Sequence, residues 1–210
     1  MSNVQNLIAE KLLGIKAVKV QPSSPFTWAS GWKSPIYCDN RKTLAYPEIR
    51  TLIKEELANI VREKYKDVEV IAGVATGAIA QGVLVAELLG KPFIYVRSSP
   101  KDHGMGNIIE GELKAGQKVV VIEDLISTGG SSLKAVNALR EAGAQVLGMV
   151  AIFTYGFPLA ANQFAEAKVE LTTLSNYEAV LQHLLDTKCI GESEMSTLKE
   201  WLKNPDVWGK

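Results

Sequence analysis

The chain has 210 residues, of which 47% are hydrophobic and 22% charged, and its 23 basic and 23 acidic side chains give a formal net charge of +0. This length suits one α/β domain with a substantial core and a small appendage, and excludes two full-sized domains. The balanced charge argues against a dedicated nucleic-acid or membrane-surface binder, which normally carries a basic excess.

The N-terminal residues predict a helix and not a targeting segment. Apolar side chains recur there at three- and four-residue steps, and the polar residues between them interrupt the apolar run that a signal peptide needs. No later segment is apolar enough for a membrane span. Cys38 and Cys189 form no paired framework, which favours free thiols in a reducing compartment. We therefore expect a cytoplasmic protein with no membrane or nucleic-acid partner.

The segment SSPFTWASGWKSPIYCDNRKT follows, and its composition differs from that of the rest of the chain. It is rich in turn formers and aromatic residues, and predicts short antiparallel strands around Ser30-Gly31. Pro47 then fits the first position of a helix that reaches about Tyr65. We expect residues 1–45 to form a hood or cap, residues 46–190 the core, and residues 191–210 a C-terminal helix, all within one structural domain.

From residue 70 onward, near-continuous apolar strands alternate with helices. This alternation predicts a five-stranded, mostly parallel sheet that is covered by helices on both faces. Ligands of such sheets bind at the carboxyl ends of the strands. The strands are expected at Val70–Ala75, Phe93–Arg97, Lys118–Glu123, Val146–Phe153 and Val169–Leu174, and one of the intervening helices at Ser131–Ala142.

The stretch from Glu123 to Ser131 combines two kinds of group at one strand end. Its Ser-Thr-Gly-Gly-Ser turn opens a helix and offers unpaired N–H groups and hydroxyls, which is a phosphate cradle without the Walker pattern. Glu123 and Asp124 would repel a phosphate, but they suit the hydroxyls of a sugar. The pattern thus favours a ribose 5-phosphate. The alternative is that the two acids merely cap the following helix.

The same stretch, VVVIEDLISTGGSS, resembles the phosphoribosyl-diphosphate (PRPP) signature of the type I phosphoribosyltransferases. The loop Arg97–Asn107, with Lys101 and His103, resembles the catalytic loop of the orotate phosphoribosyltransferases; read alone, it is a solvated polar loop. PFTWASGWKSPIYCDNR resembles the segment that forms their hood over the pyrimidine. The likeness covers roughly residues 20 to 180.

The resemblance implies a type I phosphoribosyltransferase-like fold with a small N-terminal hood. It also implies a pentosyltransferase that transfers the ribose 5-phosphate of PRPP to orotate, giving orotidine 5-phosphate and pyrophosphate in de novo pyrimidine (UMP) biosynthesis. Mg²⁺ would be held mainly by substrate oxygens and not by a dedicated protein site. A homodimer is implied in which the catalytic loop serves the neighbouring subunit. Two alternatives remain: a purine-base phosphoribosyltransferase and a PRPP-sensing regulator.

The resemblance also assigns site residues. Catalytic roles fall on Lys101, His103 and Asp124, the pyrophosphate loop is Ala75, Thr76 and Gly77, and orotate would contact Ser127, Tyr37 and Lys33. PRPP would bind Arg97, Lys101, His103, Glu123, Asp124, Leu125, Ile126, Ser127, Thr128, Gly129, Gly130 and Ser131.

The chain departs from the family at three places. Some members have a lysine where this chain has Ala29 or Thr76, and some have a later arginine with no match in Phe153–Gly156. The group that neutralises the orotate carboxylate is therefore open between Ser127, backbone N–H groups and Lys33.

Overall fold

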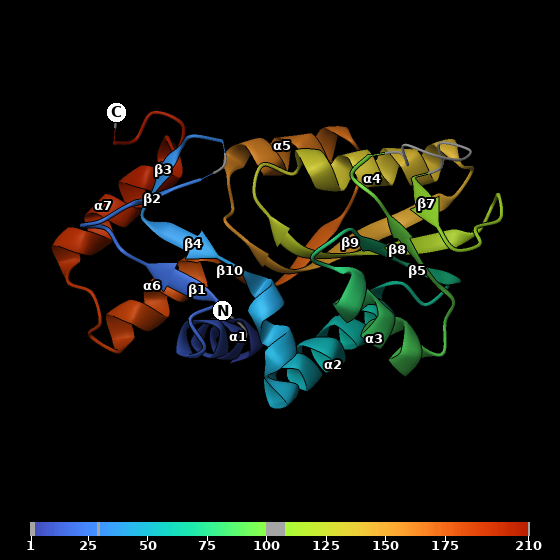
Figure 1. The fold of residues 1–210 in the computed structure, drawn as a ribbon, viewed down its shortest axis with the longest axis horizontal. Helices are drawn as coiled ribbons and strands as arrows, with labels where there is room; N and C mark the ends of the chain where they lie inside the picture. Colours follow the sequence, from blue (N-terminus) through green and yellow to red (C-terminus); the bar gives the residue numbers. More distant parts are fainter. Residues whose placement is uncertain (1–2, 29, 100–107, 210) are drawn as a thin grey trace.

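The central sheet organises the molecule. The structure, a computed structural model, describes residues 3–28, 30–99 and 108–209. Six strands of the described chain form one sheet in the order β10-β9-β8-β5-β6-β7 (Figure 1). Five of them run parallel, and β7 pairs antiparallel with β6 at one edge. Their bounds are β5 (Val70–Val74), β6 (Phe93–Val96), β7 (Ile109–Glu110), β8 (Lys118–Ile126), β9 (Gln145–Thr154) and β10 (Leu171–Asn176).

The fold class predicted from the sequence is confirmed, but the strand count of five was wrong. The five expected strands are the parallel ones, and the sixth, β7, has only two residues. A strand this short carries no alternation of side chains that a sequence pattern reveals. Strand β8 also continues three residues beyond the expected end at Glu123, because Leu125 and Ile126 still pair with Phe153 and Thr154 of β9.

Helices cover both faces of the sheet, as the continuous apolar strands predict. Successive strand residues alternate between two cores: Val120 and Ile122 face the helices below the sheet in Figure 1, while Val119 and Val121 face those above it. Below lie α1 (Asn3–Gly14), α2 (Pro47–Lys64) and α3 (Ile79–Leu89), and above lie α4 (Gly130–Glu141) and α5 (Pro158–Glu166). Within the described ranges, no helix is long and apolar enough to cross a membrane.

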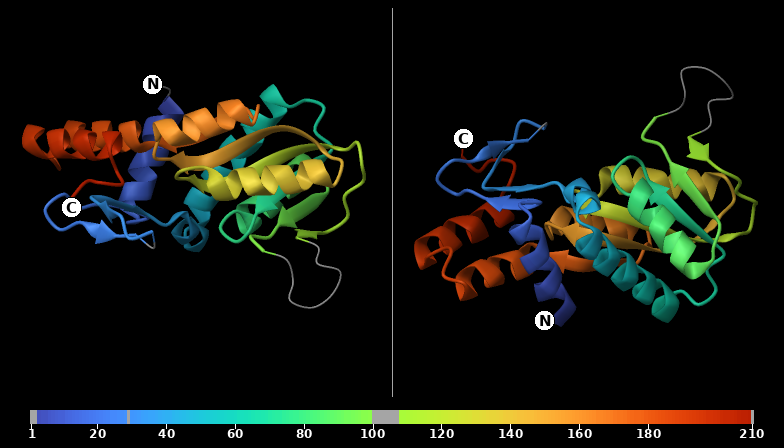
Figure 2. Two further views of the ribbon diagram at one scale, coloured as in Figure 1. Left: turned by 90° about the horizontal axis from the view of Figure 1, so that it is seen from above. Right: turned by 60° about the horizontal axis from the view of Figure 1, so that its bottom comes forward.

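The hood is a separate set of short strands beside the sheet. Strand β1 (Val18–Val20) pairs with β4 (Ile36–Cys38), and β2 (Phe26–Thr27) pairs with β3 (Lys33–Ser34), both antiparallel. The antiparallel pairing expected around Ser30-Gly31 is confirmed. A 3₁₀ helix, η1 (Asn40–Ala45), leads from the hood to α2. Figure 2 shows the hood strands, in blue, lying beside the red C-terminal helix.

The hood and the C-terminal helices share one aromatic core. Trp201 of α7 (Glu192–Lys203) is fully buried, and its indole Nε1 donates to the backbone oxygen of Lys33, 3.2 Å away. Its ring lies 5.7 Å from Trp28 of the hood and 5.3 Å from Tyr177 at the start of α6 (Tyr177–Asp186). The aromatic cluster thereby fixes the hood over the carboxyl ends of the strands.

Candidate active site

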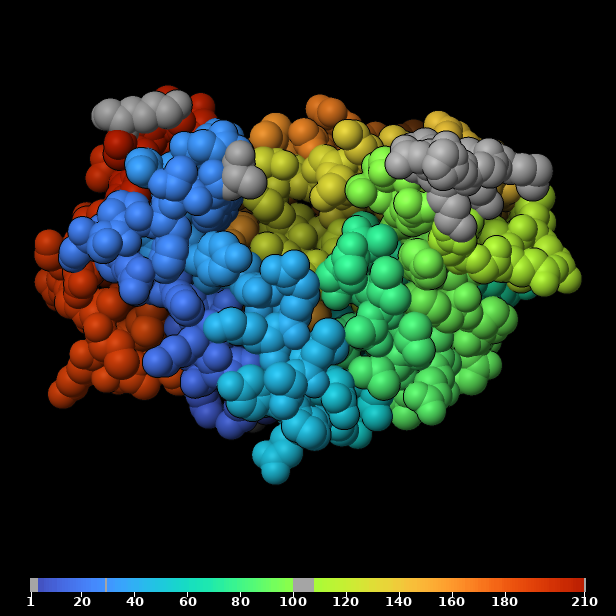
Figure 3. All heavy atoms as spheres, in the orientation of Figure 1, coloured from blue at the N-terminus to red at the C-terminus, as the bar shows by residue number. Residues whose placement is uncertain are grey.

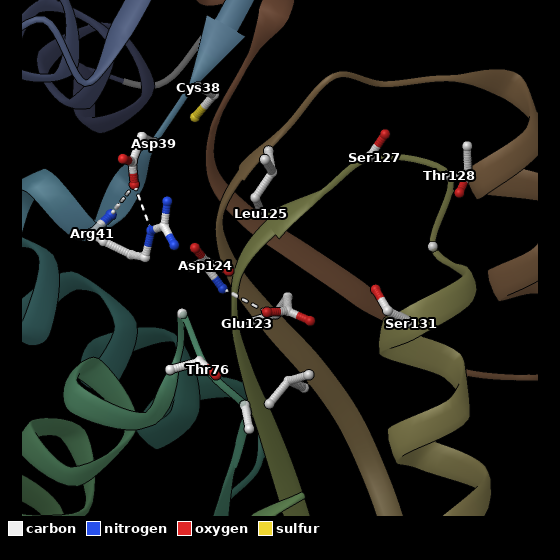
Figure 4. A pocket seen from close by; sticks show the side chains of 14 residues that line it. Cys38, Asp39, Arg41, Thr76, Glu123, Asp124, Leu125, Ser127, Thr128 and Ser131 are labelled. Atoms are coloured by element: carbon white, nitrogen blue, oxygen red, sulfur yellow. Dashed lines mark hydrogen bonds and ion pairs between the residues drawn. The ribbon is translucent and has the colours of Figure 1, made fainter. Parts of the chain in front are cut away.

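A pocket of about 500 Å³ opens at the carboxyl ends of β5 and β8, between η1 and α4. Figure 3 shows the molecule hollowed there, between the blue hood and the green helix α3. Three segments that are far apart in the chain meet at this pocket (Figure 4). The sequence predicted two of them, the loop after β5 and the stretch from Glu123 to Ser131. It is lined by Cys38, Asp39, Arg41, Val74, Ala75, Thr76, Gly77, Glu123, Asp124, Leu125, Ser127, Thr128, Gly129 and Ser131.

The turn before α4 forms one wall of the pocket. Ser127, Thr128, Gly129 and Ser131 all line it, at the N-terminus of the helix. Gly129 has a positive φ of 87°, and a side-chain carbon there would approach the ring of Phe164 to 2.9 Å. Glycine is thus required for the turn that aims the backbone N–H groups of the helix at the pocket, and such N–H groups favour an anion.

Glu123 is buried and links β8 to the first turn of α4. One carboxylate oxygen accepts the backbone N–H of Asp124 at 3.0 Å, and the other accepts the Ser132 hydroxyl at 2.8 Å. Burial, followed by the nearby charge of Asp124, raises the pKa of Glu123 well above its ordinary value. The N-cap residue of α4 is Gly129, which has no side chain to cap the helix, and Glu123 contacts the first turn through the Ser132 hydroxyl.

Asp124 lies against the loop that follows β5. Its carboxylate packs directly on Gly77, where any Cβ atom would overlap it. The same loop contains a cis peptide bond between Ala75 and Thr76. On the other side, the Asn40 side chain donates to the backbone oxygen of Asp124 at 2.5 Å. Gly77 and Asn40 together fix the position of this acid in the pocket.

The hood wall carries charged residues that the sequence analysis did not assign. Arg41 donates from Nε to the Asp39 carboxylate at 2.7 Å. This hydrogen bond, opposed in part by burial, lowers the pKa of Asp39. The signal in the sequence was the Asp-Asn-Arg run just after the hood strands, in which Asp39 also caps η1 by accepting the Arg41 N–H.

A second hollow of about 410 Å³ adjoins the first, and Trp28, Tyr37 and Tyr155 give its wall an aromatic character. It shares Cys38, Leu125 and Ser127 with the first pocket, so the two form one continuous cleft. Apolar walls with a few polar groups suit a flat heterocycle. The lining residues are Thr27, Trp28, Tyr37, Cys38, Leu125, Ser127 and Tyr155.

Comparison with known proteins identifies the family to which this chain belongs. Residues 42–179 match the phosphoribosyl transferase domain family. The chain is 62% identical over 209 residues to the orotate phosphoribosyltransferase of Porphyromonas gingivalis, with 100% of each chain covered. It is 64% identical over 208 residues to that of Phocaeicola vulgatus, covering 99% of this chain and 98% of the relative. The chain belongs to the orotate phosphoribosyltransferase family.

The three-dimensional comparison agrees with the sequence relatives. The orotate phosphoribosyltransferase from Aeropyrum pernix superposes with a TM-score of 0.74 at 27% identity, covering 88% of this chain and 99% of that one. The resemblance seen in the sequence is thereby confirmed. An orotate phosphoribosyltransferase is a pentosyltransferase of pyrimidine biosynthesis, which transfers the ribose 5-phosphate of PRPP to orotate and releases pyrophosphate.

The residues assigned from the orotate phosphoribosyltransferase resemblance do not all lie together, and Lys33 lines neither pocket of the cleft. Most of them line the cleft. Arg97 and Gly130 lie in an adjoining hollow of about 490 Å³, where Arg97 pairs with Glu110 at 3.5 Å. The side chain of Ile126 is fully buried in the core and lines neither pocket of the cleft. Lys101 and His103 lie outside the described residues.

Proposed function

We propose that the cleft binds PRPP between the Ser127–Ser131 turn and the Ala75–Gly77 loop. The 5-phosphate would bind at the turn, the ribose hydroxyls at Glu123 and Asp124, and the diphosphate near the loop and Arg97. The observation that supports this placement is that one pocket of about 500 Å³ unites the amide-rich turn, the acid pair and the loop. Each carboxylate oxygen has two acceptor sites, so Glu123 can bind a hydroxyl beside its present partners.

We propose that orotate binds in the aromatic hollow. Tyr37 and Ser127 line this hollow, and Ser127 lies where the hollow meets the ribose pocket. The Lys33 ammonium donates to the Thr27 hydroxyl at 2.9 Å, and Thr27 is part of the lining. Lys33 is thus a described residue that offers a cation to the carboxylate of an orotate bound at the edge of this hollow.

The chemistry follows from the charges that develop when the bond between ribose C1 and the diphosphate breaks. Positive charge grows on the ribose ring, where the Asp124 carboxylate stabilises it. Negative charge grows on the leaving diphosphate, where Arg97, Lys101 and His103 would stabilise it. Preorganised groups of this kind typically contribute ~10²–10³ each in turnover. The imidazole of His103 can hold or release a proton near neutral pH and so can protonate a diphosphate oxygen.

Mg²⁺ is proposed as the cofactor, carried mainly by the substrate. In the described part of the chain, no group of three or more His, Cys, Asp or Glu side chains is arranged to hold a metal ion. Mg²⁺ binds well through phosphate oxygens with one or two carboxylates. The donors present fit this mode, because Asp124 lines the pocket beside the place proposed for the ribose and diphosphate. When bound, the ion would neutralise charge on the diphosphate.

We propose a cytoplasmic homodimer in which the 97–107 loop serves the neighbouring active site. Helix α3 follows the Ala75–Gly77 loop directly and exposes two apolar side chains, with Val83 at 44% and Leu88 at 38%. An apolar helix face beside the pocket is suited to a second copy of the chain. A cytoplasmic location fits the free thiols of Cys38 and Cys189.

A mixing experiment tests the shared site. Lys101→Ala and Asp124→Ala proteins should each show almost no loss of orotate absorbance with PRPP and Mg²⁺. Mixed after dissociation and reassembly, they should regain activity, because a hybrid dimer contains one site with both residues. Two folded, dimeric variants that stay inactive together would refute the shared site. Turnover of adenine, hypoxanthine or xanthine above that of orotate in the wild type would contradict the assigned substrate.

A further inference from the structure

The proposed PRPP pocket has an electrostatic imbalance. Of the charged side chains that line it, Asp39, Glu123 and Asp124 are carboxyls, and Arg41 is the cation among the described residues. PRPP carries a phosphate and a diphosphate, and a carboxylate beside either group repels it. A cation at the hood side of the pocket is therefore required where the diphosphate would otherwise face Asp39 and Asp124.

The Arg41 side chain is 62% exposed, and its neighbours Asp39 and Asn40 position it at the pocket wall. The neighbouring Asn40 is 2% exposed and donates to the backbone oxygen of Asp124, which fixes η1 against β8. Asp39 caps η1 and accepts the Arg41 Nε–H at 2.7 Å. This ion pair uses Nε and leaves the two terminal amino groups for a further acceptor. Figure 4 shows the guanidinium pointing into the pocket on the side of Asp124.

We infer that Arg41 is a further substrate-binding residue of the orotate phosphoribosyltransferase reaction and that it binds the diphosphate of PRPP. Its Nε would stay on Asp39 while the terminal amino groups donate to diphosphate oxygens, the fork-like geometry that arginine forms with phosphates. Asp39 is then a positioning residue, which orients the guanidinium.

The position of Arg41 favours the diphosphate, and not the 5-phosphate or orotate, as the group that it binds. The turn proposed for the 5-phosphate lies across the pocket from η1, with Asp124 between them (Figure 4). A ribose that is anchored at that turn presents its other end to η1 and to the Thr76 loop. Arg41 lines this pocket and is absent from the lining of the aromatic hollow, where orotate is placed. The inference rests on the PRPP placement proposed above.

Calorimetric titration of Arg41→Gln with three probes tests the inference. Binding of PRPP and of pyrophosphate should weaken by roughly 10- to 100-fold, because a charge-assisted hydrogen-bond pair is lost. Binding of ribose 5-phosphate, which has no diphosphate, should stay within about twofold of the wild type. Arg41→Lys should recover part of the loss, since it keeps the charge but not the fork. Lys42→Gln, the next residue of η1, is the matched control because Lys42 donates to the Lys16 oxygen and does not line the pocket.

Three results would overturn the inference. The first is equal weakening of ribose 5-phosphate and PRPP by Arg41→Gln. The second is a raised KM for orotate with unchanged PRPP binding, and the third is no change at all. Asp124→Asn separates this inference from the proposed placement: it should weaken ribose 5-phosphate as well as PRPP, and if it weakens neither, the placement itself is wrong.

Discussion

Glu123 is positioned for chemistry in a way that works against folding. The residue is 4% exposed and its carboxyl group lies beside a second acid, so its negative charge is costly in the folded state. The Ser132 hydroxyl and the Asp124 N–H offset part of this cost. A buried acid with only partial compensation is typical of a ligand site, where a bound hydroxyl or cation completes the set of partners.

Replacing Glu123 by Gln should therefore stabilise the free protein. Because its pKa is raised in the folded state, the folded protein keeps this proton to higher pH than the unfolded chain does. The free energy of unfolding thus falls as pH rises from roughly 4.3, the unfolded value, through the folded pKa. Glu123→Gln removes this fall, so we expect the free energy of unfolding to rise by on the order of 1 kcal/mol at pH 7.

Urea unfolding at pH 5 and pH 8, with PRPP titration alongside, measures both effects. The Glu123→Gln protein should also bind PRPP about tenfold more weakly, since it loses a charged acceptor for the ribose. The exposed Glu112, which pairs with Lys114 at 3.7 Å, provides the control substitution Glu112→Gln, which should change neither quantity. A Glu123→Gln protein that is less stable at pH 8 with an unchanged pH slope would show that this reasoning fails.

Strands, helices and their order were predictable because each element carries its own pattern. The helix Pro47–Lys64 was predicted from Pro47 and from its apolar spacing, and the parallel strands from their apolar runs. The end of β8 was not, because Asp124 interrupts the apolar run while the pairing of Leu125 with Phe153 of β9 continues the strand. Pairing between distant segments decides strand ends, and a single segment does not reveal it.

Part of the candidate active site was likewise predictable from the sequence, and part was not. The turn before α4 and the two acids form one contiguous motif, so the sequence predicted them together. Arg41 and Asn40 reach the pocket only because the hood folds over the strand ends, and Asn40 contacts a residue 84 positions away. The contact between Trp201 and Lys33 spans 168 positions. No local sequence pattern predicts contacts between residues that are so far apart in the chain.

Trp201 is the point where α7 supports the hollow in which we propose that orotate binds. We expect Trp201→Ala to lower the free energy of unfolding by about 3–5 kcal/mol, because a fully buried indole leaves a cavity. It should also raise the KM for orotate, since Trp28, which packs on Trp201, lines the aromatic hollow. Chemical unfolding and steady-state kinetics measure the two effects.

Two further variants make the Trp201 result interpretable. Trp201→Phe keeps most of the ring packing, so it should raise the KM for orotate less, and lower the free energy of unfolding less, than Trp201→Ala does. Trp208→Ala removes a tryptophan that is only partly buried, and it should leave the KM for orotate unchanged. An unchanged KM in Trp201→Phe and Trp201→Ala, despite lower stability, would show that α7 does not set the shape of the hood.

The whole molecule surrounds its cleft on two sides, with the hood and α7 at one side and the sheet with α4 at the other (Figures 1 and 3). The remaining side lies toward Arg97 and α3, where the apolar residues of α3 are exposed. A site that must exclude water around a charged leaving group needs a cover there. A second copy of the chain, docked on α3, would bring its own 97–107 loop to this side and complete the site.

Val83→Glu tests this arrangement, because a charge at the centre of an apolar contact is costly to bury. The variant should sediment as a monomer in analytical ultracentrifugation and lose most of its turnover, while the chain stays folded, since Val83 is 44% exposed and not part of the core. Val207→Glu is the matched control: it places the same charge at a residue that is 55% exposed on the C-terminal tail, and it should remain dimeric and active. A monomeric Val83→Glu protein with full turnover would show that one chain forms a complete active site by itself, because no partner loop is then present to stabilise the leaving diphosphate.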